Sequence, residues 1–339
     1  MLHNKSNSEL LKEMDKYVIG HEKAKKTLIS LVNRSKMAHY RKYLAPMYGE
    51  EEAEVATSSC LLVGGSGTGK TYLIRTLQHI IDFPLIYIDA TRLEPTGGSN
   101  SFDSKKVLDM IMNNAKELVA DPNTPYHSVE GTIDQTVVFI DEVDKLAKAF
   151  ESSGQWNQQI QAGLLSILES YEGYDKVSFI LAGAFADMTA DVPQSVSIGF
   201  NAVPKQEIVS DVTDRDVIKY GLKPELIGRL SNIVKLDKLD HKAMKKILVD
   251  VLLPSKIEEM KFLGVDASNV LDKSEIDAIV KVSVESGQGV RALKRELGYR
   301  FNDLEFDYEN HMIKKNVTPI EEEVKERLAN LKDKLKKEF

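Results

Sequence analysis

The sequence is poor in cysteine and tryptophan and has no long apolar run. Of its 339 residues, one is cysteine, Cys60, and one is tryptophan, Trp156. A single cysteine excludes an internal disulfide and a zinc cluster of several thiolates, and it fits a reducing compartment. No apolar run approaches the roughly 20 residues that a membrane-spanning helix needs, and the start, MLHNKSNSELLKEM, lacks the apolar core of a signal peptide. We therefore expect a cytoplasmic protein without a membrane segment.

Positive charge is also in deficit. The chain has 45 lysines and arginines against 52 aspartates and glutamates, a formal net charge of −7. Dedicated nucleic-acid binders are usually basic, so nucleic acid is disfavoured as the main partner. With 42% hydrophobic and 29% charged residues the composition is that of a globular protein. The length exceeds what one core usually organises, which favours two domains.

One segment predicts a phosphate-binding loop. CLLVGGSGTGKTYLIRTLQHI, which begins at Cys60, combines an apolar strand, the pattern G-x-x-x-x-G-K-T and a helical periodicity. Backbone N–H groups of such a loop surround phosphate oxygens, the lysine reaches the β- and γ-phosphates, and the threonine hydroxyl binds Mg²⁺. We expect ATP to contact Gly64, Gly65, Ser66, Gly67, Thr68, Gly69, Lys70, Thr71 and Tyr72, with Lys70 also catalytic.

A second segment supplies acidic groups. TVVFIDEVDKL places a buried strand directly before Asp141 and Glu142, and ligands of open α/β sheets bind at such strand ends. On its own this pattern is common in strands followed by a solvated turn. Beside a phosphate loop, we expect Asp141 to hold Mg²⁺, directly or through water, and Glu142 to polarise the attacking water. The combined motifs predict ATP hydrolysis.

Short apolar runs alternate with helical patterns, which predicts an α/β fold with a mostly parallel five-stranded sheet. We expect residues 1–237 to form this domain and 238–315 a smaller, mostly helical domain, in which Ser274 and Asp277 resemble a capping box. Residues 316–339 read as a charged amphipathic helix that packs on its own domain or on a partner. The expected strands are Cys60–Val63, Leu85–Ile88, Val137–Ile140, Ser178–Ala182 and Ile233–Leu236.

Several segments, in this order, resemble the ClpX-type AAA+ protein unfoldases, of which HslU is a relative. They are YVIGHEKAKKTL, GGSGTGKT, VVFIDEVDKL, FILAGAFADM, GLKPELIGRL and SGQGVRALKREL. The resemblance covers roughly residues 14–312 and implies an AAA+ P-loop NTPase domain followed by a small helical domain. It also implies that Val18 and Ile19 contact the adenine base.

The last two segments carry arginines with implied roles. Arg229 resembles the family's arginine finger, which stabilises charge on the transferred phosphoryl group of a neighbouring subunit. The resemblance thus implies a homo-oligomeric ring, most simply a hexamer. Arg291 resembles the family's second sensor, which contacts the phosphates in cis and couples nucleotide state to the angle between domains. Either arginine can instead form only a surface salt bridge.

The sequence also departs from the family. It has no cysteine-rich zinc module, no polar sensor in Ala182-Gly183-Ala184, and no aromatic–hydrophobic–glycine pore loop. LEPTGGSNSFDS stands where that loop is expected, so Phe102 is one pore candidate, and Trp156 in AFESSGQWNQQ is another. Both aromatic side chains can instead be packed in the domain.

A further segment suggests a partner. ADVPQSVSIGFNAVPKQ holds Ile198, Gly199 and Phe200 in a polar, proline-bounded stretch, and apolar residues in such a loop suggest a partner's pocket. In ClpX a tripeptide of this composition docks onto the ClpP peptidase; a short strand is the alternative interpretation. The leading hypothesis is an ATP-driven unfoldase that feeds protein substrates to a ClpP-like peptidase. The alternatives are a non-proteolytic remodeller of a dedicated complex and, less favoured, a nucleic-acid motor.

Overall fold

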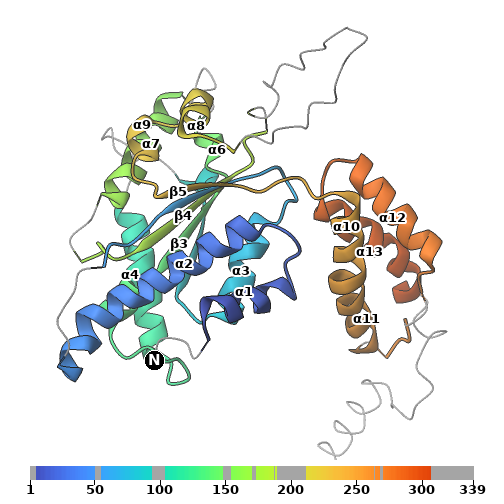
Figure 1. The fold of residues 1–339 in the computed structure, drawn as a ribbon, viewed down its shortest axis with the longest axis horizontal. Helices are drawn as coiled ribbons and strands as arrows, with labels where there is room; N and C mark the ends of the chain where they lie inside the picture. Colours follow the sequence, from blue (N-terminus) through green and yellow to red (C-terminus); the bar gives the residue numbers. More distant parts are fainter. Residues whose placement is uncertain are drawn as a thin grey trace, which may run out of the picture. The chain divides into compact units, whose positions relative to one another are not determined.

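The computed structural model describes residues 5–49, 55–93, 104–147, 154–169, 173–186, 188, 211–262, 264–267 and 270–306. The chain divides into two compact units (Figure 1). The first comprises Met1–Ala243 and Gln288–Val290, and the second comprises Met244–Gly287 and Arg291–Phe339. The helix expected over residues 316–339 lies outside the described residues.

A five-stranded parallel sheet forms the centre of the first unit, as the sequence predicts. Its strand order is β2-β3-β4-β1-β5, and every neighbouring pair is parallel. Because all strands run the same way, the chain segments that follow them leave from one edge of the sheet, where ligands of such folds bind. The strands are β1 (Cys60–Val63), β2 (Leu85–Asp89), β3 (Val137–Asp141), β4 (Ser178–Gly183) and β5 (Asn232–Lys235).

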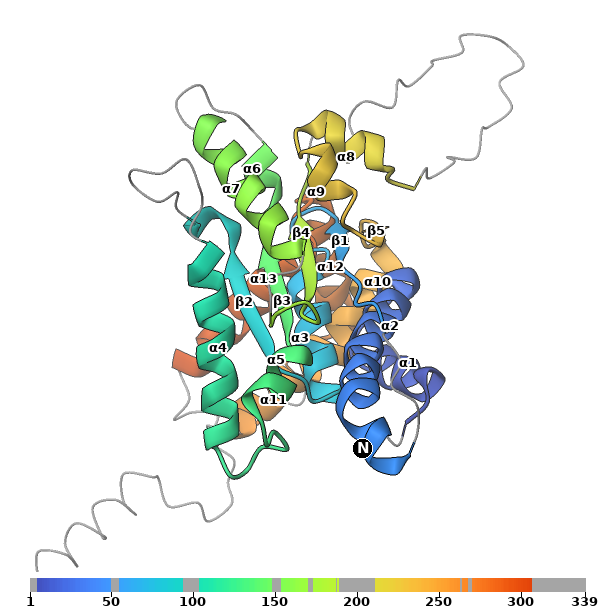
Figure 2. The ribbon, with the colours of Figure 1, turned by 90° about the vertical axis from the view of Figure 1, so that its left-hand side faces the viewer.

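Both faces of the sheet are covered by helices (Figures 1 and 2). Successive side chains of β1 point to opposite faces of the sheet and so belong to two different cores. Cys60 and Leu62 pack with α1 (Asn7–Asp15), α2 (Glu22–His39) and α3 (Lys70–Ile80). Leu61 and Val63 pack with α4 (Ser104–Ala120) and α7 (Gly154–Leu168). Cys60 is buried, and burial raises the pKa of its thiol to about 12. The apolar runs therefore reflect strands buried on both faces.

Shorter elements complete this unit. A π-helical turn, η1 (Tyr40–Leu44), and a 3-10 turn, η2 (Ala45–Tyr48), extend α2. The others are η3 (Ala90–Arg92), α5 (Val129–Asp134), α6 (Asp144–Ala147), α8 (Asp214–Tyr220) and α9 (Pro224–Ile227). Within the described residues, no helix combines the length and apolarity needed to cross a bilayer.

The described part of the second unit is mainly helical. Its helices are α10 (His241–Ile247), which begins in the first unit, η4 (Leu248–Leu252), α11 (Leu253–Phe262), α12 (Lys273–Glu285) and α13 (Val290–Phe306). The capping box expected at Ser274 is wrong: Asp272 caps α12 and forms the box with Glu275. Asp277 instead contacts Lys245 at 2.5 Å. The pair Asp272 and Glu275 and the pair Ser274 and Asp277 have the same spacing of three residues. The sequence alone therefore did not show which pair caps the helix.

Lys36, on α2, is a half-buried cation of the first unit. Its ammonium donates to the carbonyl oxygen of Asp82. Burial lowers the pKa of Lys36 from 10.5 to about 8, and the Asp82 charge only partly opposes this shift. Between pH 8 and 10.5 the unfolded chain therefore keeps a proton that the folded chain has lost, so this group makes stability rise with pH. At pH 7 its burial costs on the order of 3 kcal/mol.

We predict that Lys36→Met raises the free energy of unfolding at pH 7 by about 1–2 kcal/mol, since the hydrogen bond lost with the ammonium offsets part of the gain. This gain in unfolding free energy should shrink at pH 9.5, where the Lys36 amine of the folded wild type is already neutral. Urea denaturation at both pH values measures this. Lys26→Met is the control, because Lys26 is exposed on the same helix and pairs with Glu22. Equal destabilisation by both substitutions would contradict the prediction.

Candidate nucleotide site

The loop between β1 and α3 has the backbone freedom that its glycines predict. Gly67 and Gly69 have φ angles of 76° and 99°, which are costly for residues with a side chain. At Gly64 the requirement is space, because a Cβ there would lie 2.9 Å from Leu236. Gly69 is the N-cap of α3, so the loop ends at the positive end of that helix dipole. The loop therefore has the features of a phosphate cradle.

The remaining loop residues line this turn. The Thr68 side chain is buried, and its hydroxyl donates to the Gly65 carbonyl oxygen at 2.9 Å. Ser66 and Tyr72 are exposed. Thr68 thus stabilises the loop from inside, while Ser66 and Tyr72 present surface to a ligand.

Side chains at the start of α3 connect the loop to the acidic strand. The Lys70 ammonium donates to the carbonyl oxygens of Gly64, at 2.5 Å, and Gly65, at 3.2 Å. The Thr71 hydroxyl donates to Asp141 Oδ2 at 2.8 Å. Because β4 lies between β1 and β3, this bond spans the sheet edge. The structure thus brings together the lysine, threonine and aspartate expected from the two motifs.

Glu142 follows on a strained turn. Its φ angle is 61°, a left-handed conformation that costs a non-glycine residue about 1–2 kcal/mol. Its backbone N–H donates to Asp141 Oδ1 at 2.9 Å, which supports the turn. The Glu142 side chain is exposed. A carboxylate that projects from this turn can contact a water molecule beside a bound phosphate.

Two hydrogen bonds tie this turn to the end of β4. The Val143 N–H donates to the Ala182 carbonyl oxygen at 2.9 Å, and the Ala184 N–H donates to Asp144 Oδ1 at 3.0 Å. The Asp144 side chain is buried, with 3% of its surface exposed. Asp144 therefore anchors the residues that directly follow Glu142.

Gly183 makes this anchor possible. A Cβ at Gly183 would lie 2.8 Å from Asp144 Oδ1 and 2.6 Å from the Phe185 ring. Phe185 itself has a φ angle of 47°, so the chain leaves β4 in a second left-handed turn. No polar side chain occupies the positions 182–184. Their contribution is close backbone contact with the turn that carries Glu142.

The segment expected at the adenine base lies before α2. Val18 is buried in the core and Ile19 is half-buried, so Ile19 offers more surface to a ligand. The next residues include His21, the N-cap of α2, whose φ angle is 56°. Burial lowers the pKa of His21, and a hydrogen bond with the Thr68 backbone partly opposes this. A neutral imidazole thus lies against the phosphate loop. The sequence did not lead us to expect this contact; the position of His21 directly after Gly20 was the available signal.

The two predicted arginines occupy different units. Arg229 follows α9 in the first unit, and its guanidinium donates to Glu169 Oε1 at 2.6 Å and 3.1 Å. About half of each side chain is exposed, 53% for Arg229 and 42% for Glu169. Arg291 lies in the first turn of α13 and is exposed. The Arg229 contact is therefore a surface salt bridge that a stronger anion can displace.

The candidates for substrate and peptidase contacts are not described. Phe102 and the segment Ile198–Gly199–Phe200 lie outside the described residues. Trp156 is in α7, but its side chain is outside the description. These residues remain sequence-based expectations.

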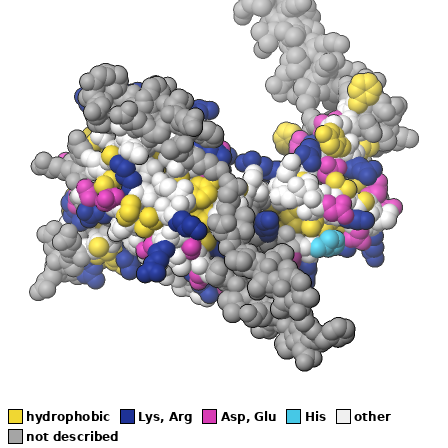
Figure 3. Space-filling view, turned by 90° about the horizontal axis from the view of Figure 1, so that it is seen from above, with side chains coloured by type: hydrophobic (Ala, Val, Ile, Leu, Met, Phe, Trp, Pro, Cys, Tyr) yellow, Lys and Arg dark blue, Asp and Glu magenta, His cyan; other side chains and the backbone are white. Residues whose placement is uncertain are grey.

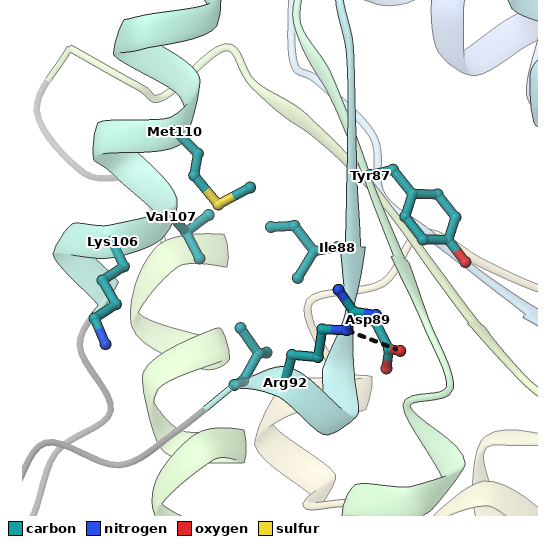
Figure 4. Close-up of a pocket in the computed structure, with 8 residues that line it drawn as sticks. Tyr87, Ile88, Asp89, Arg92, Lys106, Val107 and Met110 are labelled. Carbon is teal, nitrogen blue, oxygen red and sulfur yellow. Dashed lines mark ion pairs between the residues drawn. The ribbon is translucent and has the colours of Figure 1, made fainter.

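A cavity of about 490 Å³ lies between β2 and α4 (Figure 4). Ile88, Val107 and Met110 point into it, whereas Tyr87 projects from the opposite side of β2. An ion pair of 3.8 Å joins Arg92 to Asp89 at its border. The cavity lies on the face covered by α4, whereas the phosphate loop leads into α3 on the other face.

Comparison with known proteins agrees with this site. Residues 60–191 match the family described as "ATPase family associated with various cellular activities (AAA)". The chain is 29% identical over 320 residues to the "ATP-dependent Clp protease ATP-binding subunit ClpX" of Bacteroides fragilis, covering 84% of this chain and 73% of that protein. The same identity and coverages hold over 320 residues for Bacteroides thetaiotaomicron ClpX and over 325 for Treponema denticola ClpX.

We predict that Asp144→Ala lowers kcat for ATP about 10-fold, less than the roughly 100-fold or greater loss of a general base because Asp144 only positions Glu142, while the KM for ATP stays within about 3-fold. Asp144→Asn should keep most activity, because the amide oxygen can still accept the Ala184 N–H. Steady-state ATPase assays measure both. Asp175→Ala, which removes the 3.2 Å ion pair with Lys176, is the control. Wild-type kcat in Asp144→Ala, or an Asn variant as weak as the Ala variant, would contradict the prediction.

Proposed function

We propose that this chain, which is similar over most of its length to ClpX subunits, is an ATPase that unfolds proteins and feeds them to a ClpP-like peptidase. The observation that carries the proposal is the convergence of Lys70, Thr71 and Asp141 beside the exposed Glu142. A glutamate next to a nucleotide site serves hydrolysis, which a protein that only binds nucleotide does not need. We place this activity in the cytosol, a reducing compartment that suits a chain with one thiol.

Mg²⁺ is the cofactor expected with ATP, and the donor set fits it. The Thr71 hydroxyl and an Asp141 carboxylate oxygen lie 2.8 Å apart, and hard oxygen ligands suit this cation. Bound there, the ion would neutralise charge on the phosphates. Lys70 would contact the β- and γ-phosphates, and Glu142 would orient water and accept its proton.

In a ring, Arg229 would act across a subunit boundary. Its partner Glu169 holds the guanidinium in the separate subunit. Phosphate carries more negative charge than one carboxylate and accepts bidentate contacts from arginine, so a neighbour's γ-phosphate can displace Glu169. Arg291 would contact the phosphates bound to its own subunit. The ring is most simply a hexamer, by similarity to the relatives.

We predict that mixing Arg229→Ala subunits with Glu142→Gln subunits yields more ATPase activity than either variant alone, because some sites then combine an intact finger with an intact glutamate. Each variant alone should lose about 100-fold or more in turnover. Ring assembly is checked by light scattering. Arg215→Ala, at an exposed arginine of α8, should behave as wild type. Assembled mixtures with no added activity would exclude the trans role.

The peptidase partnership is proposed for the segment around Phe200. Burying Ile198 and Phe200 in a partner contributes roughly 1.5–3 kcal/mol each before ordering costs. A single loop would bind weakly, but loops on one ring act together, and tethering raises the combined affinity. The ClpX relatives are ATP-binding subunits of a Clp protease, which supports this partner.

We predict that Phe200→Ala abolishes degradation by a ClpP-like peptidase while ATP hydrolysis and unfolding persist. Titrating the ring against the peptidase and following peptide cleavage measures the docking. Val203→Ala removes an apolar side chain from the same segment and serves as the control. If the wild type binds no such peptidase, or Phe200→Ala gives the wild-type curve, the non-proteolytic remodeller is the better function.

Ion pairs on α2 disfavour the nucleic-acid alternative. Three lysines of this basic helix have acidic partners: Lys25 contacts Asp15, Lys26 contacts Glu22, and Lys23 contacts Asp211. On the face shown in Figure 3, acidic and basic side chains are interspersed. Neutralised lysines release few counterions from a phosphate backbone, so they add little affinity for DNA or RNA.

A further inference from the structure

Tyr87 contacts the acidic strand end from the edge of the sheet. Its hydroxyl donates to Asp141 Oδ2 at 3.1 Å, the same oxygen that accepts the Thr71 hydroxyl at 2.8 Å. The other oxygen, Oδ1, accepts the Glu142 N–H at 2.9 Å. The Asp141 carboxylate therefore has three donors, from β2, α3 and its own turn, and its plane is fixed from three directions.

The strand pairing sets the place of Tyr87. It lies opposite Phe139 in the β2–β3 register, and the two rings are 5.5 Å apart between centroids. The Arg75 guanidinium lies 5.9 Å from the centre of the Tyr87 ring, a cation–π distance. The ring is thus held by contacts that do not involve its hydroxyl.

We propose that Tyr87 is a positioning residue for the metal site, which holds the Asp141 carboxylate in the orientation that Mg²⁺ requires. The inference rests on the proposed role of Thr71 and Asp141 as the Mg²⁺ site. A carboxylate offers lone pairs in its own plane, so rotation about its last bond moves them away from an ion held by Thr71. Outer partners of metal ligands commonly change metal affinity 10–100-fold when removed.

The hydroxyl can be removed without disturbing the fold. Tyr87 is 44% exposed on an edge strand, and Tyr87→Phe keeps the contacts with Phe139 and Arg75. The substitution thus separates positioning of the carboxylate from packing. Tyr48→Phe is the matched control, because it removes a hydroxyl from an exposed tyrosine in η2.

The experiment measures Mn²⁺ binding to the protein·ADP complex by electron paramagnetic resonance. We expect Tyr87→Phe to weaken Mn²⁺ about 10-fold, with ADP affinity in EDTA unchanged. The half-saturating Mg²⁺ concentration for ATP hydrolysis should rise by the same factor, with kcat largely restored at saturating Mg²⁺. Tyr48→Phe should match wild type in each measurement.

Two failures are distinguishable. If wild-type protein·ADP binds Mn²⁺ no more tightly than free ADP does, the proposed metal site itself is wrong, and the role of Tyr87 falls with it. If the wild type binds Mn²⁺ and Tyr87→Phe binds it equally well, the metal site stands and the positioning role is overturned. Weaker ADP binding in EDTA would also overturn it, because that result indicates general damage to the pocket.

Discussion

The hydrogen bond between the Thr71 hydroxyl and Asp141 joins the two halves of the nucleotide site. It links the first turn of α3 to the end of β3 across the intervening strand β4. Each half alone is a common local structure, a glycine turn or an acidic strand end. Because the parallel sheet delivers both to one edge, a hydroxyl and a carboxylate meet at a distance at which one small cation can contact both.

Strain is concentrated around the same edge. Glu142 and Phe185 both have left-handed backbone conformations, and the hydrogen bonds from Val143 and Ala184 lie between them. Such conformations persist where the surroundings over-determine them. A turn held in this way has few alternative conformations, so the carboxylate of Glu142 starts from a restricted set of positions.

The sequence predicts those parts of the protein whose causes are local. The strands are continuous apolar runs, and the phosphate loop is a spacing of glycines beside one lysine, so both were readable. Tyr87, Asp144 and His21 were not, because their partners are distant: Tyr87 and Asp141 are 54 positions apart, and Asp144 and Ala184 are 40. Only the strand order and register bring such pairs together. The misplaced cap at Ser274 is a local error, since neighbouring acceptors compete for the same N–H groups.

The burial of Cys60 has a practical consequence for measuring motion. The only thiol of the chain lies in a central strand with a pKa of about 12, so almost none of it is thiolate, the form that reacts with alkylating dyes. A cysteine introduced at an exposed position would then be the single reactive site, with no need to remove the native one. With one such cysteine introduced in each unit, a donor and an acceptor dye can report distances between the two units through a cycle of nucleotide turnover.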